Sequence, residues 1–271
     1  MTTSPLKWAG GKRWIVPMLK EYYQAAIRTD RDIRLVEPFC GGLSVTLGLE
    51  PIRALAGDKL VPLVNFWCHV KAGLGFNIDK WQRTEIEYYR VRERFNKISE
   101  TKSEESAILF YYLNRAGFNG LCRFNAKGGF NVPWGGGKTN KLIPLGDYRT
   151  ALARVEFTCR DFRSTLARCS ANDFIYADPP YDTEFTAYGP GGFSWGDQRD
   201  LVRILADAPC SVVISNQATE RIVKCCLDSG FALHYRDVRR CIRSYTTKGG
   251  KTADRKAREI VAINAKLQKM L

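Results

Sequence analysis

The chain has 271 residues, 45% of them hydrophobic and 12% aromatic, which is typical of a folded globular protein and excludes a disordered tail. Its 42 lysine and arginine residues outnumber its 28 aspartate and glutamate residues, and the net charge of +14 favours a nucleic acid as partner. No apolar run is long enough to cross a bilayer and no secretion signal is visible, so we expect a soluble cytoplasmic protein with no membrane partner. With only two histidines and no zinc-knuckle spacing among the cysteines, we expect no metal.

The predicted elements alternate between short strands and helices. In the first half, the pattern predicts strands at 34–38 and 53–56 and helices at 43–49, 81–98 and 103–112. The apolar positions of the 81–98 helix are Ile86, Tyr89 and Phe95. Between 117 and 137, glycines and alternating aromatic residues predict a hairpin and loops.

In the second half, apolar runs predict five strands and three helices. The strands are expected at 155–159, 173–177, 210–215, 231–238 and 259–264, and the helices at 161–167, at 198–206 and up to residue 227. Repeated strand–helix units predict an α/β fold with a doubly wound, mostly parallel sheet and helices on both faces.

A glycine turn follows the first strand, in the region where open α/β sheets bind ligands. The turn, Glu37-Pro38-Phe39-Cys40-Gly41-Gly42, does not match the dinucleotide pattern G-x-G-x-x-G. Asp58 ends the next strand, where a carboxylate can accept hydrogen bonds from ribose hydroxyls. Trp8 adds a flat apolar face and Lys12 a cation, which suits an amino acid with an attached adenosine. A plain β-turn and a loosely packed N-terminal arm are the alternative interpretation.

The segment Asp178-Pro179-Pro180-Tyr181 follows a buried strand. The amine of a purine is a poor nucleophile because its lone pair is delocalised into the ring. A carboxylate (Asp178) and a rigidly held carbonyl (Pro179) that accept its two N–H bonds would direct the lone pair at an electrophilic methyl group. Tyr181 would stack on the base, which implies a nucleotide flipped out of the helix.

These motifs make the chain similar to the Dam-type (D12 class, alpha group) DNA adenine-N6 methyltransferases. The resemblance covers nearly the whole chain and includes Leu-Lys-Trp-Ala-Gly-Gly-Lys at 6–12, Glu-Pro-Phe-Cys-Gly-Gly at 37–42, Asn-Gly-Leu-Cys-Arg-Phe-Asn at 119–125, Phe-Asn-Val-Pro-Trp at 130–134, Asp-Pro-Pro-Tyr at 178–181, Phe-Thr-Ala-Tyr at 185–188, Ser-Asn at 215–216 and Val-Arg-Arg at 238–240.

The resemblance implies a sheet of the kind found in methyltransferases that use S-adenosyl-L-methionine (AdoMet), at 1–60 and 146–271. An inserted, mainly helical target-recognition subdomain with a β-hairpin would occupy 61–145. The implied activity is methylation of adenine N6 in double-stranded DNA at GATC or a related short site, by base flipping and in-line attack. We expect a monomer or weak dimer in a bacterial cell or a phage-infected host. The implied cofactor-binding residues are Trp8, Lys12, Glu37, Phe39, Asp58 and Asp178, and the implied catalytic residues are Asp178, Pro179 and Tyr181.

By the same resemblance, DNA contacts fall on the hairpin and on basic residues. Arginine reads guanine with two hydrogen bonds, and an aromatic side chain can enter an opened base step. Where relatives carry an arginine behind the aromatic of the 130–134 motif, this chain has Gly135-Gly136-Gly137-Lys138, so that contact is lost or moves to Lys138 and the fourth base of a GATC-like site stays open. The implied DNA-binding residues are Lys7, Phe118, Asn119, Leu121, Arg123, Lys138, Arg239 and Arg240.

Three other functions remain open from the sequence. Similar motifs serve methyltransferases that act on RNA adenine or on protein glutamine, but the glutamine enzymes typically begin theirs with asparagine. A catalytically idle DNA-binding protein could keep the same fold. The intact Lys12, Asp58, Asp178 and Tyr181 argue against it.

Overall fold

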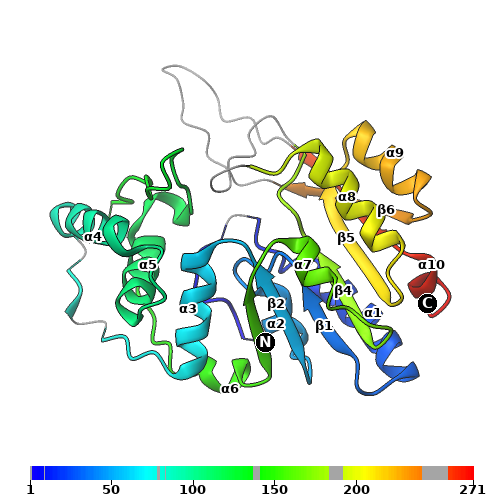
Figure 1. The fold of residues 1–271 in the computed structure, drawn as a ribbon, viewed down its shortest axis with the longest axis horizontal. Helices are drawn as coiled ribbons and strands as arrows, with labels where there is room; N and C mark the ends of the chain where they lie inside the picture. The colour runs from blue at the N-terminus through cyan, green and yellow to red at the C-terminus, as the bar shows by residue number, and fades with distance from the viewer. Residues whose placement is uncertain are drawn as a thin grey trace.

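The computed structural model describes residues 2–8, 10–77, 80–82, 84–136, 141–182, 192–239 and 256–271. Within these ranges seven strands form one sheet in the order β3-β2-β1-β4-β5-β7-β6 (Figure 1). Strands β1 to β5 are parallel, whereas β7 runs antiparallel to both of its neighbours. The predicted doubly wound, mostly parallel fold is therefore confirmed. The strands are Arg34–Glu37 (β1), Ala54–Asp58 (β2), Val155–Cys159 (β3), Asp173–Ala177 (β4), Ser211–Gln217 (β5), Ala232–Arg239 (β6) and Lys256–Ile263 (β7).

Alternate residues of the strands are buried on opposite faces of the sheet, as the twofold repeat of a strand requires. On β4, Phe174 joins one hydrophobic cluster and Ile175 the other. Helices with side chains in the Phe174 cluster are Val16–Thr29 (α1), Ser44–Leu49 (α2), Val61–Ala72 (α3) and Ala265–Gln268 (α10). Helices with side chains in the Ile175 cluster are Phe162–Leu166 (α7), Trp195–Ala206 (α8) and Glu220–Asp228 (α9). Both faces are thus covered.

The sequence interpretation assigned no helix to four segments that are α-helical in the structure, namely α1, α3, α6 (Tyr148–Leu152) and α10. Helix α1 carries Pro17 in its first turn, a position that does not need a backbone N–H, and buries Leu19, Tyr22 and Tyr23. Ahead of this helix, Leu6 and Lys12 are only 5% and 6% exposed, so the 6–12 segment is packed and is not a loose arm. Among the described residues, no helix combines the length and the apolar surface that crossing a bilayer requires.

The inserted region contains two longer helices, Glu85–Ile98 (α4) and Glu104–Ala116 (α5) (Figure 1). Ser103 caps α5 by accepting a hydrogen bond from the backbone N–H of Ser106, as its sequence predicted. The predicted apolar face of α4 was wrong in part, because Ile86 is 85% exposed. The buried side is formed instead by Tyr88, Val91 and Phe95, which recur at helical spacing.

Residues 117–136, which we call the bridged segment, fold back on themselves through two isolated antiparallel bridges, Gly117 with Trp134 and Phe124 with Phe130. Apart from the short helix Phe118–Gly120 (η2), they carry no regular element within the described residues. The rings of Phe124 and Phe130 are buried and meet edge to face at 5.5 Å. The hairpin path was predicted, and the burial of Phe124 was not.

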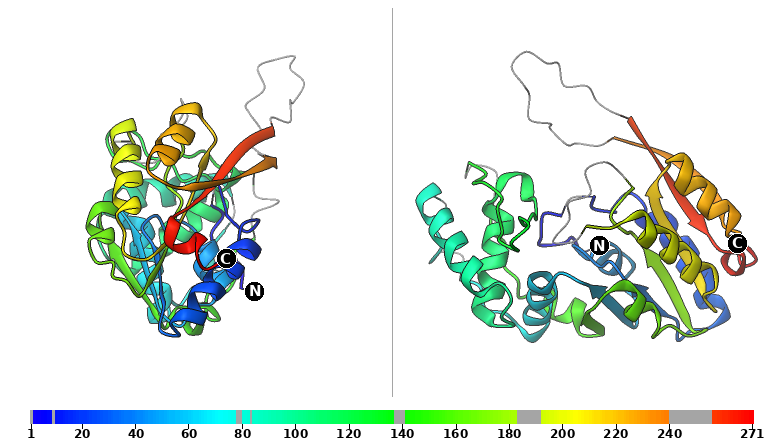
Figure 2. Two further views of the ribbon diagram at one scale, coloured as in Figure 1. Left: turned by 90° about the vertical axis from the view of Figure 1, so that its right-hand side faces the viewer. Right: turned by 45° about the horizontal axis from the view of Figure 1, so that its top comes forward.

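Helix α3 links the inserted region to the sheet, since it packs against β2 and β3 on one side and α5 on the other. Its side chains belong to the same hydrophobic cluster as those of α4 and α5. The division into 1–60 with 146–271 and 61–145 stays a prediction. At the opposite end of the sheet, Figure 2 shows β6 and β7 as a twisted pair beside α9 and α10.

Candidate active site

The strand order reverses between β1 and β4, which places the residues after these two strands side by side at one edge of the sheet. Glu37 ends β1, and the Asp178–Tyr181 turn follows β4. Because β7 runs antiparallel, its first residues reach the same edge, and Glu259 lies there opposite Gln217 of β5. The edge therefore collects charged side chains from distant parts of the sequence.

Asp178 is held through one carboxylate oxygen. Its Oδ1 accepts a hydrogen bond from Ser215 Oγ at 2.8 Å and lies 3.2 Å from Lys12 Nζ. Ser215 Oγ is also 2.9 Å from the Tyr176 hydroxyl, so a chain of hydroxyls on adjacent strands supports the carboxylate. Burial raises the pKa of Asp178, and the charge of Lys12 opposes this rise. The side chain remains 22% exposed, which leaves it accessible from the edge of the sheet.

Lys12 is the positive centre of this cluster. Its side chain is only 7% exposed, and Nζ also lies 3.9 Å from Glu259 Oε2 and 4.6 Å from the centroid of the Tyr181 ring. The Tyr181 hydroxyl donates a hydrogen bond to Glu259 Oε2 at 2.7 Å. One cation, two carboxylates and one aromatic ring thus form a connected group, which we call the catalytic cluster: Lys12, Asp178, Tyr181, Ser215 and Glu259.

Two buried amides support the turn between Asp178 and Tyr181. Gln198 Nε2 donates to the carbonyl of Pro180 at 2.8 Å, and Asn216 Nδ2 donates to Gln198 Oε1 at 3.0 Å. Both amide side chains are almost fully buried. We call this chain of two hydrogen bonds the amide relay. It engages the Pro180 carbonyl and so restrains the backbone next to the Pro179 carbonyl.

The glycine turn after β1 is fitted closely around Asp58 and two tryptophans. The backbone N–H of Gly41 donates to Asp58 Oδ2 at 3.3 Å, and its carbonyl accepts from Trp67 Nε1 at 3.0 Å. Gly41 has φ +45°, and a Cβ there would lie 2.6 Å from Trp8 Nε1, so both conformation and space require glycine. Trp8 therefore packs on the turn, and burial raises the pKa of Asp58.

Glu37 is buried and accepts hydrogen bonds from the backbone N–H and the hydroxyl of Thr46, both at 3.3 Å. Burial raises its pKa to about 8, against these two hydrogen bonds. Phe39 is half-buried and contacts the rings of Phe162 and Phe193 at 5.5 and 5.6 Å. The crevice therefore has an acidic inner end and an aromatic wall.

These residues fit AdoMet by their chemistry. The cofactor carries sulfonium and ammonium cations, one carboxylate and a ribose. The catalytic cluster has two carboxylates for one ammonium, so its formal negative charge suits a cation. Asp58 lies where a carboxylate can accept hydrogen bonds from a ribose, and Phe39 offers an apolar surface. Within the described residues no three metal-ligating side chains gather in one place.

The predicted DNA residues Lys7, Phe118, Asn119 and Leu121 lie together. The side-chain amide of Asn114 on α5 binds both the N–H and the carbonyl of Lys7, at 2.9 and 2.7 Å. A Cβ on Gly120 would lie 2.1 Å from Lys7 Cβ, so the two chain segments touch there. Burial lowers the pKa of Lys7, and Arg115 adds to this. Phe118 and Leu121 pack at the margin of the core, and Asn119 is exposed with φ +53°.

Arg123 is exposed on the bridged segment and is held only by its neighbour across the turn among the described residues. Its Nε donates to Asn131 Oδ1 at 2.8 Å. Lys138, Arg240 and the side chain of Arg239 lie outside the described residues, as do Phe185 and Tyr188 of the 185–188 motif. The sequence from 236 to 258 carries nine lysines and arginines against two aspartates, and its residues 240–255 lie outside the described residues as well.

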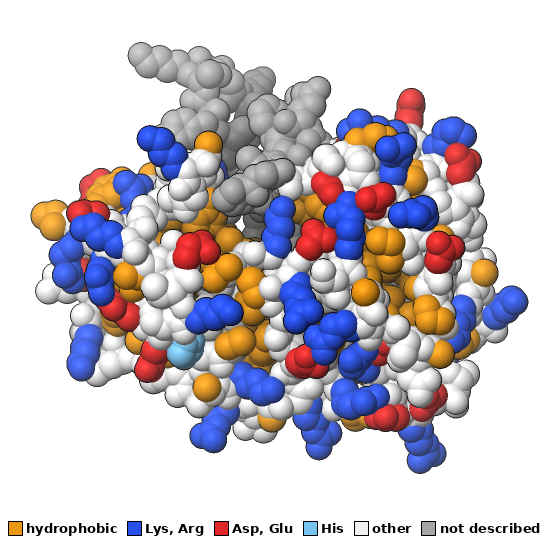
Figure 3. Space-filling model, in the orientation of Figure 1, with side chains coloured by type: hydrophobic (Ala, Val, Ile, Leu, Met, Phe, Trp, Pro, Cys, Tyr) orange, Lys and Arg blue, Asp and Glu red, His pale blue; other side chains and the backbone are white. Residues whose placement is uncertain are grey.

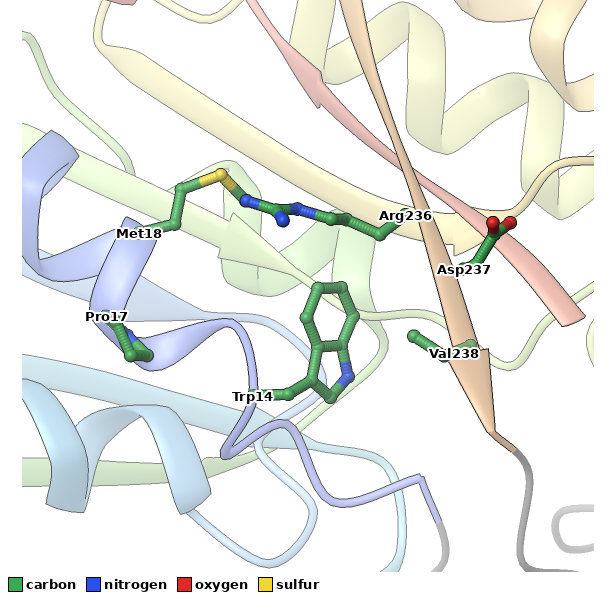
Figure 4. Close-up of a pocket in the computed structure, with 6 residues that line it drawn as sticks. All are labelled: Trp14, Pro17, Met18, Arg236, Asp237 and Val238. Carbon is green, nitrogen blue, oxygen red and sulfur yellow. The ribbon is translucent and has the colours of Figure 1, made fainter. Parts of the chain in front are cut away.

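A groove of about 460 Å³ lies between α1 and β6. Arg236 pairs directly with Glu259 across the two strands, so both side chains stand on the same face of the sheet. Figure 4 shows Arg236 reaching from β6 towards Met18 on α1, with the Trp14 indole beside it. On the face seen in Figure 3, lysine and arginine side chains are spread over the surface rather than gathered in one patch.

Sequence reasoning missed several residues of the site. Glu259 and Gln198 stand in a strand and a helix whose own patterns give no functional signal, and only the tertiary structure brings them to the turn. Ser215 was noted as part of a motif without a role, although it binds Asp178 directly. A polar residue within the apolar run of β5 was the available signal, because buried polar groups need partners.

The doubly wound sheet, the crevice after β1 and the carboxylate cluster after β4 define an AdoMet-dependent methyltransferase fold. Comparison with known families narrows the class. The model of the D12 class N6 adenine-specific DNA methyltransferases matches residues 8–242, and the chain belongs to that family.

Characterised relatives carry consistent names. The retron Ec67 DNA adenine methylase of Escherichia coli is 33% identical over 96% of this chain and 90% of that protein. The DNA adenine methylases of Vibrio cholerae and Haemophilus influenzae are each 34% identical over 79% of this chain, covering 81% and 79% of those proteins. A solved rRNA methyltransferase from Streptomyces viridochromogenes aligns over 100% of this chain and 93% of its own, but its TM-score of 0.36 and identity of 15% carry no argument.

Proposed function

We propose that the protein methylates N6 of adenine in duplex DNA at a short site of the GATC kind, by base flipping and direct in-line attack. The observation that supports this proposal most is that two described partners of Asp178 bind the same carboxylate oxygen. Among the described residues, Ser215 and Lys12 both bind its Oδ1, which leaves Oδ2 to accept an N–H of the target amine. The carbonyl of Pro179 would accept the second N–H, since the Gln198 relay holds the neighbouring Pro180 carbonyl.

When bound, AdoMet supplies an electrophilic methyl group on its sulfonium sulfur. Two acceptors on one amine favour a tetrahedral nitrogen, whose lone pair is then directed away from the ring and towards the crevice. Tyr181 would stack on the extruded base, with its ring fixed by Glu259 and Lys12. The proton leaves N6 after transfer, and no covalent link to the protein forms.

We assign cofactor binding to Trp8, Lys12, Glu37, Phe39, Asp58 and Asp178. The mutual contacts around Gly41 and around Lys12 support this assignment. DNA contacts are assigned to Lys7, Phe118, Asn119, Leu121, Arg123, Lys138, Arg239 and Arg240. The meeting of Lys7 with the 118–121 turn supports the first four as one surface, and Arg123 is the residue we expect to read a base.

The experiment is methylation of unmodified duplex DNA by the purified protein with radiolabelled AdoMet, followed by digestion with methylation-sensitive nucleases. We expect label in N6-methyladenine at one short sequence. Label in RNA or in protein glutamine, with none in DNA adenine, would refute the proposal. The absence of any transfer, together with absent stabilisation of the protein by AdoMet in a thermal melt, would indicate an idle binding protein.

A further inference from the structure

In the proposed function Glu259 serves only to hold the Tyr181 ring, yet it also lies close to Lys12, so it touches two other members of the catalytic cluster. It begins the part of β7 that pairs with β5, and the antiparallel direction of β7 brings it to the edge where the parallel strands end. The residue is 5% exposed although it is charged. A carboxylate is seldom buried without a partner, because removing its hydration costs several kcal/mol.

Two of its partners are residues of the candidate active site. Glu259 Oε2 accepts the hydrogen bond of the Tyr181 hydroxyl at 2.7 Å and lies 3.9 Å from Lys12 Nζ. Lys12 Nζ is closer to Asp178, at 3.2 Å. The ammonium therefore stands between two carboxylates, one of which faces the reacting amine in the proposed function.

We propose that Glu259 is a positioning residue for methyl transfer: it anchors the Tyr181 ring through the hydroxyl and shares the charge of Lys12 with Asp178. The inference rests on the proposed function, because it assigns Glu259 a role in a reaction that occurs at Asp178 and Tyr181. The hydrogen bond to Glu259 would prevent the Tyr181 ring from rotating, so that the ring stays parallel to an incoming base. Because Lys12 interacts with both Glu259 and Asp178, it neutralises less of the charge of Asp178 than it would if Asp178 were its only carboxylate partner. Asp178 is then a stronger acceptor of N–H bonds.

Two substitutions separate these two actions. Glu259→Gln keeps a side-chain oxygen that accepts the Tyr181 hydroxyl, but it removes the negative charge. Glu259→Ala removes both. Glu156→Gln is the matched control, since Glu156 is another strand glutamate with an ion-pair partner, Arg168, but lies on β3 with its side chain 54% exposed.

The first measurement is the pH profile of kcat. Burial is the main cause that raises the pKa of Asp178, and the charge of Glu259 raises it further. In Glu259→Gln we therefore expect the acidic limb of the profile to move to lower pH, while the plateau of kcat falls roughly 5- to 10-fold because the carboxylate is a weaker acceptor. A purely structural role would move neither limb.

The second measurement needs no methyl transfer. A duplex with 2-aminopurine at the adenine that the wild-type protein methylates is titrated with protein in the absence of AdoMet, and its fluorescence reports stacking of the extruded base. We expect Glu259→Gln to match the wild type within about 2-fold in the Kd for this duplex and in the fluorescence signal, and Glu259→Ala to lose the signal. In the methylation assay Glu259→Ala should also lose roughly 100-fold in kcat/KM.

Three outcomes decide the matter. The inference is refuted if Glu259→Gln leaves the pH profile unchanged, or if Glu259→Ala behaves like Glu156→Gln in both measurements. If Glu259→Ala does not fold in a thermal melt, Glu259→Gln still decides through the pH profile. A wild-type protein that methylates no adenine refutes the proposed function itself, whereas an active wild type with unaffected Glu259 variants refutes this inference alone.

Discussion

In the catalytic cluster, the ion pairs join residues from distant parts of the chain, although Lys12 Nζ also donates to the nearby Gly10 carbonyl at 3.1 Å. In the bridged segment, by contrast, the exposed side chains of Arg123 and Asn125 are held by near neighbours. Lys12 meets Asp178 and Glu259 across three elements of the fold. Arg123 is bound by Asn131, eight residues away, and Asn125 by the backbone N–H groups of its own turn.

This difference suits two different tasks. Charges that must act on a reacting amine gain from a fixed arrangement, because no reorganisation is then needed during the reaction. Side chains that read a base adjust to the duplex and gain from local, replaceable contacts. We therefore expect substitutions in the catalytic cluster to change kcat and stability, and substitutions in the bridged segment to change affinity and site choice.

The largest effect is expected for Asp178→Ala. Loss of the carboxylate removes one partner each from Lys12 and Ser215 and leaves the target amine without its first acceptor, so kcat should fall by roughly 10³-fold or more. Asp207→Asn, at the exposed end of α8, is the control and should keep wild-type activity. Comparable rates for the two variants in the radiolabel assay would remove the catalytic cluster from the mechanism.

Next in size is a pH effect on stability that originates at Glu37. The folded protein keeps the Glu37 proton up to a pKa of about 8, whereas the unfolded chain releases it near 4.5. Since the folded state binds more protons in this window, the free energy of unfolding falls as pH rises through it, by about 3 kcal/mol between pH 5 and pH 8. Glu37→Gln imitates the protonated form and should remove most of this slope.

Urea unfolding at pH 5 and pH 8 measures the slope for the two proteins. A smaller slope that remains in the variant is expected from Asp58 and Asp178, because burial raises the pKa of both carboxyls. An unchanged slope in Glu37→Gln would mean that the buried end of the crevice does not hold a proton.

How far the sequence predicts this site depends on where each residue lies. Asp178, Tyr181 and Lys12 stand in short motifs whose residue types indicate a chemistry, so they were predicted from the sequence, and the structure brings the three together. Glu259 and Gln198 stand in ordinary strand and helix patterns, and their roles arise from pairing between β5 and β7 and from packing of α8 on the turn. Contacts between residues so far apart in the sequence cannot be predicted from local sequence patterns.

The third prediction concerns the amide relay behind the turn. Gln198→Leu keeps the volume but removes the donor to the Pro180 carbonyl and the acceptor for Asn216. Buried polar groups without partners should lower the free energy of unfolding by about 2 kcal/mol. We also expect kcat to fall by roughly 10-fold, since the Pro179 carbonyl loses its support. A variant with reduced stability but unaltered kcat would show that the relay serves folding only.

For the fold, the strands were predicted more completely than the helices. All seven strands were predicted. Strands covered on both faces, such as β4 and β5, are recognisable as apolar runs because they bury most of their side chains, whereas the described side chains of the edge strand β6 are exposed or half-buried. Helix α3 was missed because it is buried on nearly every side and therefore shows no polar face. On α4 the error was one of register: Ile86 is apolar and exposed, and the helical spacing of Tyr88, Val91 and Phe95 gives the buried side.

The smallest effect is expected in the bridged segment itself. Arg123→Ala removes an exposed side chain whose described partners are two atoms of Asn131, so the melting temperature should stay within about 1 °C of the wild type. If Arg123 reads a guanine, kcat/KM for the preferred site should fall roughly 10-fold, through KM, while other sites lose less.

Arg94→Ala on α4 is a control of the same residue type, since Arg94 is exposed and paired with Glu105. An equal loss at all sequences would indicate a phosphate contact instead of base reading, because phosphate contacts carry no sequence information. A loss of stability in Arg123→Ala would contradict the distinction between the two regions, since it would mean that the bridged segment depends on this side chain for its fold.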